Sequence, residues 1–216
     1  MTATRPPDPA RLRREYCNPP IERAALAGDP REQFRRWFAH AVASGITEPN
    51  AMTLSTVDDR GRPSARIVLL KGVDEGFVFY TNYRSRKGRE LEANPHAALV
   101  FNWLDLARQV RITGACTRVP DHLSDAYWAT RPPGSRLSAA ASPQSVVLND
   151  ADDLRRRIDE LAARYPDGDV PRPAHWGGLR LTPDTVEFWQ GRPDRLHERF
   201  RYRRSAGTWI IERLAP

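Results

Sequence analysis

A series of short apolar runs, each closed by a turn, constrains the fold of this chain more than any other feature. Runs of strand length occupy residues 51–57, 64–71, 76–81, 97–103 and 108–118, and three more follow near 179–190, 195–203 and 208–213. Turn sequences such as "DDRG" and "GVDEG" separate the early runs, as they do between neighbouring antiparallel strands. The pattern predicts an antiparallel meander that closes into a small β-barrel.

Segments with helical character flank the predicted barrel. In "DPREQFRRWFAHAVASG", Asp29 is a good helix N-cap and Pro30 takes the first helical position. One apolar face then follows, formed by Phe34, Trp37, Phe38 and Val42. Two further helical patches cover residues 121–130 and 150–164.

Length and composition limit the class of protein. The 216 residues suit one core, so we expect a mobile N-terminal arm (1–28) and a single domain (29–216). The net charge of +7 favours an anionic partner, but the basic residues are spread along the chain without a nucleic-acid-binding motif. No apolar run is long enough to span a membrane, and no targeting segment is seen. Cys17 and Cys116 form no CxxC pair or disulfide framework, so we expect a cytoplasmic protein. From the spread of charge and the absence of a long apolar run, we expect it to bind neither nucleic acid nor membrane.

The common catalytic and nucleotide-binding motifs are missing from the sequence. Its five histidines and two cysteines are scattered, so no group has metal-ligand spacing and no metal is expected. There is no GxSxG, no GxGxxG after a strand and no GxxxxGK[ST] loop. A bound phosphate would therefore have to be held by side chains.

The stretch "NYRSRKGREL" places positive charge at the start of a helix. Ser85 is a good N-cap, yet Arg86, Lys87 and Arg89 follow in the first turn, where the helix dipole is already positive. A dianionic phosphate would make this turn favourable, with Arg86 and Lys87 among its ligands. The alternative is a solvated basic turn without a ligand.

A second basic cluster lies in "RLHERFRY". Strand alternation would put four of its side chains on one face, suited to an anion or an aromatic acceptor: Arg195, His197, Arg199 and Arg201. The alternative is an exposed edge strand kept soluble by its charge.

A third cluster lies in "DHLSDAYWATRPPGSRL". If residues 121–130 are helical, Tyr127 and Arg131 are an i,i+4 pair, and Ser135 lies just past the Pro-Pro-Gly exit. Together these groups would suit a phosphomonoester, whereas a surface helix with an incidental arginine is the alternative. The "ASPQS" and "VEFWQG" stretches add a Gln-Ser pair and Trp189, which suit the edge and face of a heteroaromatic ring, although a tryptophan is more often part of a core.

The motifs of this chain, taken in order, resemble those of the pyridoxamine 5'-phosphate oxidases, also called pyridoxine 5'-phosphate oxidases. Between Leu12 and Pro216 the chain carries "RIVLLK", "FYTNYRSRKGREL", "ARQVRITG", "YWATRP", "ASPQS", "PAHWGG", "VEFWQG", "DRLHERFRY" and "ERLAP". The resemblance implies an FMN-binding split β-barrel, mainly antiparallel β with flanking helices, that forms a homodimer with flavin between the subunits. It also implies oxidation of pyridoxine or pyridoxamine 5'-phosphate by oxygen to pyridoxal 5'-phosphate and hydrogen peroxide, a step of vitamin B6 metabolism.

The resemblance also implies roles for individual residues. FMN would contact Arg66, Ile67, Val68, Leu69, Leu70, Lys71, Tyr80, Thr81, Arg86, Lys87, Gln109, Gln144, Ser145, Trp189 and Arg199. The substrate would contact Arg13, Arg14, Tyr16, Lys71, Tyr127, Arg131, Ser135, Arg195 and His197. Of these, Arg195 would clamp the pyridine ring over the flavin with the help of His197, as the catalytic pair. No residue is assigned as the proton acceptor.

Two alternatives stay open at this point. A phenazine-pathway oxidase shares the fold, the FMN site and a similar C-terminal motif, but its members tend to lack a lysine at the position of Lys71. Lys71, Tyr127 and Arg131 therefore favour the vitamin B6 substrate. The other alternative is a flavin- or nucleic-acid-binding module without catalysis, which turnover of pyridoxine 5'-phosphate would exclude.

Overall fold

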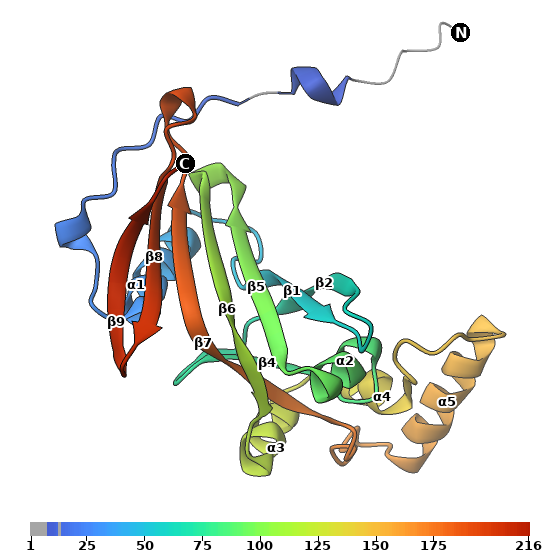
Figure 1. The fold of residues 1–216 in the computed structure, drawn as a ribbon. Helices are drawn as coiled ribbons and strands as arrows, with labels where there is room; N and C mark the ends of the chain where they lie inside the picture. Colours follow the sequence, from blue (N-terminus) through green and yellow to red (C-terminus); the bar gives the residue numbers. More distant parts are fainter. Residues whose placement is uncertain (1–7, 13) are drawn as a thin grey trace, which may run out of the picture.

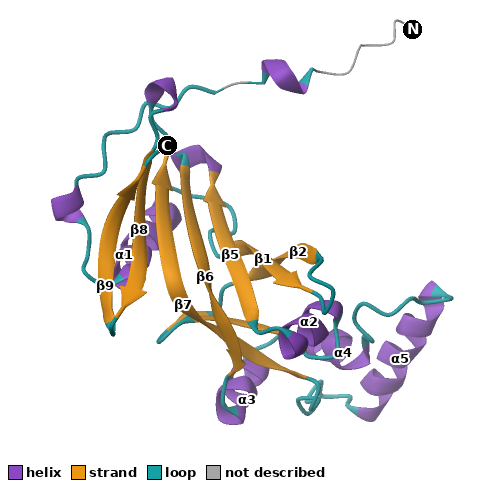
Figure 2. Ribbon diagram, viewed as in Figure 1, coloured by secondary structure: helices purple, strands orange, loops and turns teal. Residues whose placement is uncertain are grey.

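A computed structural model describes residues 8–12 and 14–216 of the chain. The described strands form one nine-stranded antiparallel sheet: β1 (Ala51–Val57), β2 (Pro63–Leu69), β3 (Gly72–Val73), β4 (Phe77–Asn82), β5 (His96–Trp103), β6 (Arg108–Arg118), β7 (Trp176–Gln190), β8 (Glu198–Ser205) and β9 (Thr208–Leu214). The α-helices that flank it are α1 (Pro30–Ala43), α2 (Arg86–Ala93), α3 (Asp121–Ala129), α4 (Pro133–Ala141) and α5 (Ala151–Arg164) (Figures 1 and 2). The prediction of a mainly antiparallel β fold with flanking helices is confirmed.

The long strand β7 divides one of its edges between two neighbours. The strand order is β2-β1-β5-β6-β7-β4-β3, and β8 and β9 continue from β7. Residues 176–181 of β7 pair with β4, whereas residues 185–190 pair with β8. At this change the register with β6 shifts: Thr113 pairs with Thr185 and Gly114 with Pro183, so Asp184 is an extra residue on β7. An added Cβ at Gly114 would lie 2.0 Å from the carbonyl oxygen of Thr182. Among the described strands, β2 and β3 do not pair, so the barrel is split, as the resemblance implies. The closed barrel predicted from the pattern of apolar runs is therefore wrong.

Helix α1 packs against the sheet to form the main core. The ring of Phe34 lies 5.0 Å from that of Phe77, and the ring of Trp37 lies 5.1 Å from that of Phe188. These contacts confirm the predicted apolar face of α1. Val42 is 53% exposed, however, so the prediction that it belongs to this face is wrong.

Helices α2, α3, α4 and α5 gather at the end of the long strands that lies away from the C-terminus (Figure 1). Helix α2 begins directly after Ser85, as predicted, and the Ser85 hydroxyl accepts a hydrogen bond from the Gly88 amide at 3.3 Å. The helix predicted over residues 121–130 ends at Ala129, before Pro132, as predicted. The sequence pattern did not predict α4, which begins at Pro133. Proline is favoured at that position, since its missing N–H would be unpaired there in any case.

Strand β8 begins three residues later than predicted, at Glu198. Asp194 and Arg195 have φ angles of 52° and 60°, in the left-handed region, and belong to a short 3-10 turn. A chain in this conformation cannot alternate its side chains as a strand does. Arg195 and His197 therefore do not share a strand face with Arg199.

The described part of the N-terminal arm crosses the end of the sheet near the C-terminus (Figure 1). The Asn18 side-chain amide donates to the carbonyl oxygens of Leu106 and Gly191 at 3.2 and 3.3 Å. The Ile21 amide donates to the carboxylate of Glu198 at 2.8 Å. The arm is thus held against the sheet at several points, and its mobility stays a prediction.

Candidate functional site

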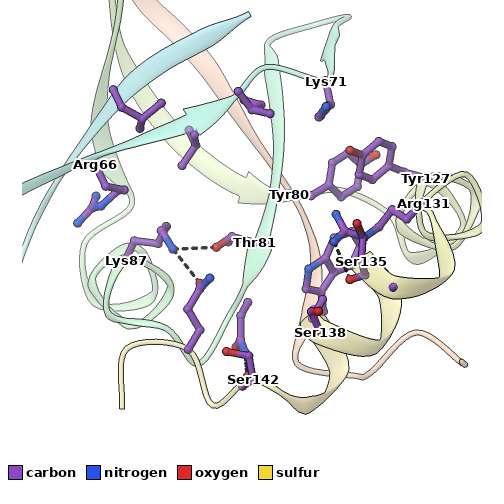
Figure 3. A pocket seen from close by; sticks show the side chains of 18 of the residues that line it. Arg66, Lys71, Tyr80, Thr81, Lys87, Tyr127, Arg131, Ser135, Ser138 and Ser142 are labelled. Atoms are coloured by element: carbon purple, nitrogen blue, oxygen red, sulfur yellow. Dashed lines mark hydrogen bonds between the residues drawn. The ribbon is translucent and has the colours of Figure 1, made fainter. Parts of the chain in front are cut away.

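A cavity of about 760 Å³ lies between the sheet and the helices at one end of the strands (Figure 3). Many of the residues predicted to bind cofactor or substrate line it: Arg66, Ile67, Val68, Leu69, Lys71, Tyr80, Thr81, Lys87, Tyr127, Arg131, Ser135 and Gln144. The chain has only two lysines, Lys71 and Lys87, and both line this cavity.

Lys87 projects from the first turn of α2 toward β4 (Figure 3). Its ammonium donates to Gln144 Oε1 at 2.8 Å and to Thr81 Oγ1 at 3.2 Å. Burial and the nearby charge of Arg66 lower the pKa of Lys87 to about 8, against a smaller opposing effect of Glu90. A dianion beside this ammonium would favour its charged form. The site is therefore suited to a phosphate.

Behind the side of the cavity that carries Lys87, the buried carboxylate of Glu90 binds two arginines. Glu90 is 5% exposed and accepts hydrogen bonds from Arg66 at 3.2 Å and from Arg86 at 2.8 Å. It also accepts from the hydroxyls of Thr56 and Ser64, at 2.5 and 2.6 Å. Although burial opposes ionisation, these donors lower the pKa of Glu90 to about 2. Glu90 is thus a permanent anion.

Stacked aromatic rings form the opposite wall of the cavity. The rings of Tyr80 and Tyr127 stack at 4.0 Å, and Trp176 lies parallel to both, with its ring 5.5 Å from that of Tyr80. The Arg131 guanidinium lies over Trp176 at 5.0 Å, and the Lys71 ammonium lies 5.8 Å from the Tyr127 ring. This wall presents two cations and two tyrosine side chains to the cavity.

Arg131 has a donor that is not used. Its Nη2 donates to the carbonyl oxygen of Ser135 at 3.0 Å, whereas its Nε is buried without a hydrogen-bond partner among the described residues. Arg131 has no carboxylate partner among the described residues, so the charge of its guanidinium is available to an anion in the cavity. The predicted grouping of Tyr127, Arg131 and Ser135 around one cavity agrees with this arrangement.

A second cluster of predicted residues lies at the other end of β7. Gln109 faces Trp189 across β6 and β7, and Trp189 faces Arg199 across β7 and β8. The rings of Tyr16 and His197 lie 5.9 and 4.8 Å from that of Trp189. His197 Nδ1 accepts from the Arg192 amide at 3.2 Å, and burial together with the charge of Arg195 lowers the pKa of His197.

The two groups of residues cannot meet within one chain. Trp176 borders the cavity and Trp189 belongs to the second cluster, yet both lie on strand β7. At about 3.3 Å per residue, they are separated by roughly 40 Å along the strand. The predicted site is thus divided between the two ends of the sheet.

Several predicted residues lie outside the cavity. Arg199 and Arg201 are paired with carboxylates, Glu187 at 2.8 Å and Glu212 at 2.7 Å, so the expected row of four groups that need an anion is wrong. Leu70 is buried in the core, and Ser145, an exposed residue with φ of 71°, follows Gln144 in a loop.

Three other predicted contacts are placed as follows. Arg86 does not line the cavity and is bound to Glu90. Arg14 donates to the carbonyl oxygen of Leu104 at 3.3 Å, at the end of the sheet where the second cluster lies. Arg13 lies outside the described residues.

Sequence reasoning missed several residues of the cavity, namely Asn82, Gly134, Ser138, Ala139, Ser142, Leu154, Ile158 and Trp176. A signal for some of them was present, because Ser135, Ser138 and Ser142 recur at the spacing of one helical face. That face becomes visible only once α4 is recognised. Glu90 gave no signal, since an acidic residue on a short helix is usually exposed.

Two features are absent from the part of the chain that the structure describes. No group of three or more His, Cys, Asp or Glu side chains in it is placed to hold a metal ion. None of its helices is long and apolar enough to cross a membrane.

Comparisons with known proteins show to which family the chain belongs. The family model described as "Pyridoxamine 5'-phosphate oxidase" matches residues 38–165, and that described as "Pyridoxine 5'-phosphate oxidase C-terminal dimerisation region" matches residues 176–216. Proteins named pyridoxine/pyridoxamine 5'-phosphate oxidase from Salinibacter ruber and Cupriavidus pinatubonensis are each 56% identical, over 96% of this chain and 98% of their own length. PhzG from Burkholderia lata, solved with tetrahydrophenazine-1-carboxylic acid, is 34% identical, with a TM-score of 0.85 over 89% of this chain and 95% of that one. The chain therefore belongs to the pyridoxamine 5'-phosphate oxidase family.

Proposed function

We propose that this protein is an FMN-dependent oxidase that converts pyridoxine or pyridoxamine 5'-phosphate to pyridoxal 5'-phosphate. Oxygen would be the electron acceptor and hydrogen peroxide the second product. Family membership supports an oxidoreductase, and the named relatives match nearly the whole chain. The observation that carries the choice of a phosphorylated substrate is the pair of cations, Arg131 and Lys71, that lines the cavity beside the hydroxyls of Tyr127 and Ser135. A cytoplasmic location and a place in vitamin B6 metabolism belong to the same proposal.

The cavity residues fit FMN. Strand β2 is at the edge of the sheet, so one row of its backbone N–H and C=O groups, over residues 66–69, is free of a partner strand and available to the polar rim of a flavin. Lys87, with the hydroxyl of Thr81, offers an ammonium and a hydroxyl to its phosphate. When bound, FMN would supply the hydride acceptor and the reaction with oxygen. The side chains of the protein would bind and orient.

The other wall of the cavity is suited to the phosphate of the substrate. Arg131 and Lys71 would provide positive charge, while Tyr127 and Ser135 would provide hydroxyl donors. This leaves Lys87 for the phosphate of the cofactor, so the two phosphates would bind to separate groups of cations. Such charge-assisted contacts contribute about 1.5 to 3 kcal/mol each.

We also propose that a second copy of the chain completes the site. The family model of the dimerisation region covers β7, β8 and β9, which carry Trp189, Arg199 and, just before β8, Arg195 and His197. These residues cannot reach the cavity of their own chain, but in a symmetric dimer each cluster could meet the cavity of the other subunit. Arg195 would then hold the pyridine ring over the flavin, assisted by His197.

We expect the protein to be a dimer without flavin, because both walls of the site must be in place before FMN binds. Light scattering of the apoprotein measures this directly. A stable monomer that binds FMN with the same affinity as the purified holoprotein would contradict a site between subunits.

The test of function is turnover, which also separates the two named activities of this fold. Pyridoxine 5'-phosphate is expected to be consumed with release of hydrogen peroxide in equal amount. The competing candidate is a phenazine-pathway oxidase, favoured by the likeness to PhzG, which was solved with a tricyclic carboxylic acid. Turnover of dihydro- or tetrahydrophenazine carboxylic acids without turnover of the pyridoxine ester would select that candidate. FMN binding without either reaction would indicate a binding module.

A further inference from the structure

Glu90 lies behind the cavity wall that carries Lys87 and contacts two neighbouring cations, Arg66 and Arg86. Its Oε2 accepts from Arg66, and its Oε1 accepts from Arg86, one turn earlier on α2. Glu90 itself does not line the cavity and is 5% exposed. A buried charge of this kind persists only where it is fully paired. Glu90 therefore acts on the cations that it binds and not on a ligand directly.

The contacts of Glu90 fix the orientation of Arg66. One guanidinium nitrogen of Arg66 donates to the Leu54 carbonyl oxygen at 3.1 Å and to Thr56 Oγ1 at 2.6 Å. The other donates to Ser64 Oγ and to Glu90. Because Thr56 and Ser64 also donate to Glu90, the hydroxyls link the carboxylate and the guanidinium into one network. Arg66 therefore has one defined position at the cavity wall.

The charge of Glu90 also acts on Lys87. Among the described residues, Arg66 from β2 and Glu90 from α2 are the charged groups that shift the pKa of Lys87, in opposite directions. The other hydrogen-bond partners of Lys87 are neutral: Thr81 from β4, Ser85 at the start of α2 and Gln144 from the loop after α4. Without Glu90, the positive charges of Arg66, Arg86 and Lys87 would lie near one another with no anion between them.

We propose that Glu90 is a positioning residue of the phosphate subsite: its carboxylate fixes Arg66 and offsets the charge of the neighbouring cations, so that Lys87 meets a ligand as an ammonium. Nothing in the family models or in the roles implied by the resemblance assigns this to Glu90. The identification of the ligand as the FMN phosphate rests on the proposed function.

The expected pH dependence follows from the direction of the Lys87 shift. The phosphate of FMN is a dianion above a pH of about 6, whereas Lys87 loses its proton as the pH rises through about 8. FMN affinity should then be constant near pH 7 and fall above pH 8. Replacing Glu90 by a neutral residue lowers the pKa of Lys87 further, so the fall should begin at a lower pH.

The test compares Glu90→Gln, which removes the charge and keeps the shape, with the parent protein. Lys87 is followed in the apoproteins by brief acetylation with acetic anhydride at graded pH and peptide mass spectrometry. Since Lys71 is the only other lysine, it is an internal control from the same cavity. We expect the half-maximal pH of Lys87 to be lower in E90Q by at least about half a unit, with Lys71 unchanged. The pH at which FMN affinity declines should shift in the same direction.

Two variants separate charge from packing. Glu92→Gln makes the same chemical change on the same helix, at an exposed side chain that pairs with Arg118 at 3.6 Å, and should leave Lys87 unchanged. Glu90→Asp keeps the buried charge and should restore most of the Lys87 midpoint. A midpoint in E90D as low as in E90Q, or an equal shift in E92Q, would overturn the proposal.

An unchanged Lys87 midpoint in E90Q would also overturn it. If E90Q does not fold, Ser64→Ala takes its place, since it removes one link between Glu90 and Arg66 at a half-buried strand position. This variant should weaken FMN binding about threefold or more, and unaltered binding would count against the role of Glu90. If the parent protein bound no FMN at all, the proposed function would fail, but the Lys87 midpoint would still decide the role of Glu90.

Discussion

Unphosphorylated pyridoxine is expected to react at least about a thousandfold less efficiently than pyridoxine 5'-phosphate, measured as kcat/KM from peroxide release. The ester would meet Lys71, Tyr127, Arg131 and Ser135 in the cavity. Without it, several charge-assisted hydrogen bonds are lost, and Lys71 and Arg131 are left without an anion in the cavity. Equal reaction of the two compounds would remove the phosphate from the account of substrate recognition.

The matched variant for this prediction is Arg131→Ala. It should lower kcat/KM for the phosphorylated substrate by roughly ten- to a hundredfold and leave the FMN content of the protein intact. Its reaction with unphosphorylated pyridoxine should change much less, because that substrate has no phosphate to bind. Loss of flavin from R131A would instead mean that Arg131 belongs to the cofactor subsite.

Lys87→Met should weaken FMN binding about ten- to a hundredfold, as measured by titration of flavin fluorescence into the apoprotein. Lys87 lines the cavity and has hydrogen bonds only to neutral oxygens, so its charge is available to a phosphate. Methionine keeps most of the side-chain volume and removes the charge.

Arg86→Ala is the comparison, and the structure ranks it below Lys87→Met. From the sequence, both cations of the first turn are expected to bind the phosphate, and Arg86→Ala is expected to weaken FMN binding about ten- to a hundredfold. In the structure Arg86 does not line the cavity, and its guanidinium is bound to Glu90 at 2.8 Å. A larger loss of FMN affinity in R86A than in K87M would show that Arg86 leaves Glu90 when the cofactor binds.

Much of the fold could be predicted from local patterns. The strands of the meander follow the alternation of buried residues, which in β1 repeats every second position. Asp29 and Ser85 begin α1 and α2 because each side chain caps the backbone N–H groups of its own first turn. The predictions failed in two places. Helix α4 was missed because a proline after one helix can also be the first residue of the next. The start of β8 was placed too early because the left-handed turn before it has no sequence signal.

The sequence by itself determined the residue types of the site: basic, aromatic and hydroxyl side chains in three clusters, without metal ligands or a nucleotide-binding loop. It also determined the family, because the motifs of these clusters occur in one order along the chain. Such features are local, since each depends on residues that are near neighbours in the sequence.

Only the tertiary structure decided which of these clusters meet. Strand β7 separates the cavity around Lys87 and Arg131 from the cluster around Trp189, because an extended strand of 15 residues holds its two ends far apart. Packing of α2 against β1 and β2 likewise buried Glu90 beside Thr56 and Ser64, which are far from it in the sequence. Strand pairing and helix packing join residues across long separations, and no local pattern records which partners they join.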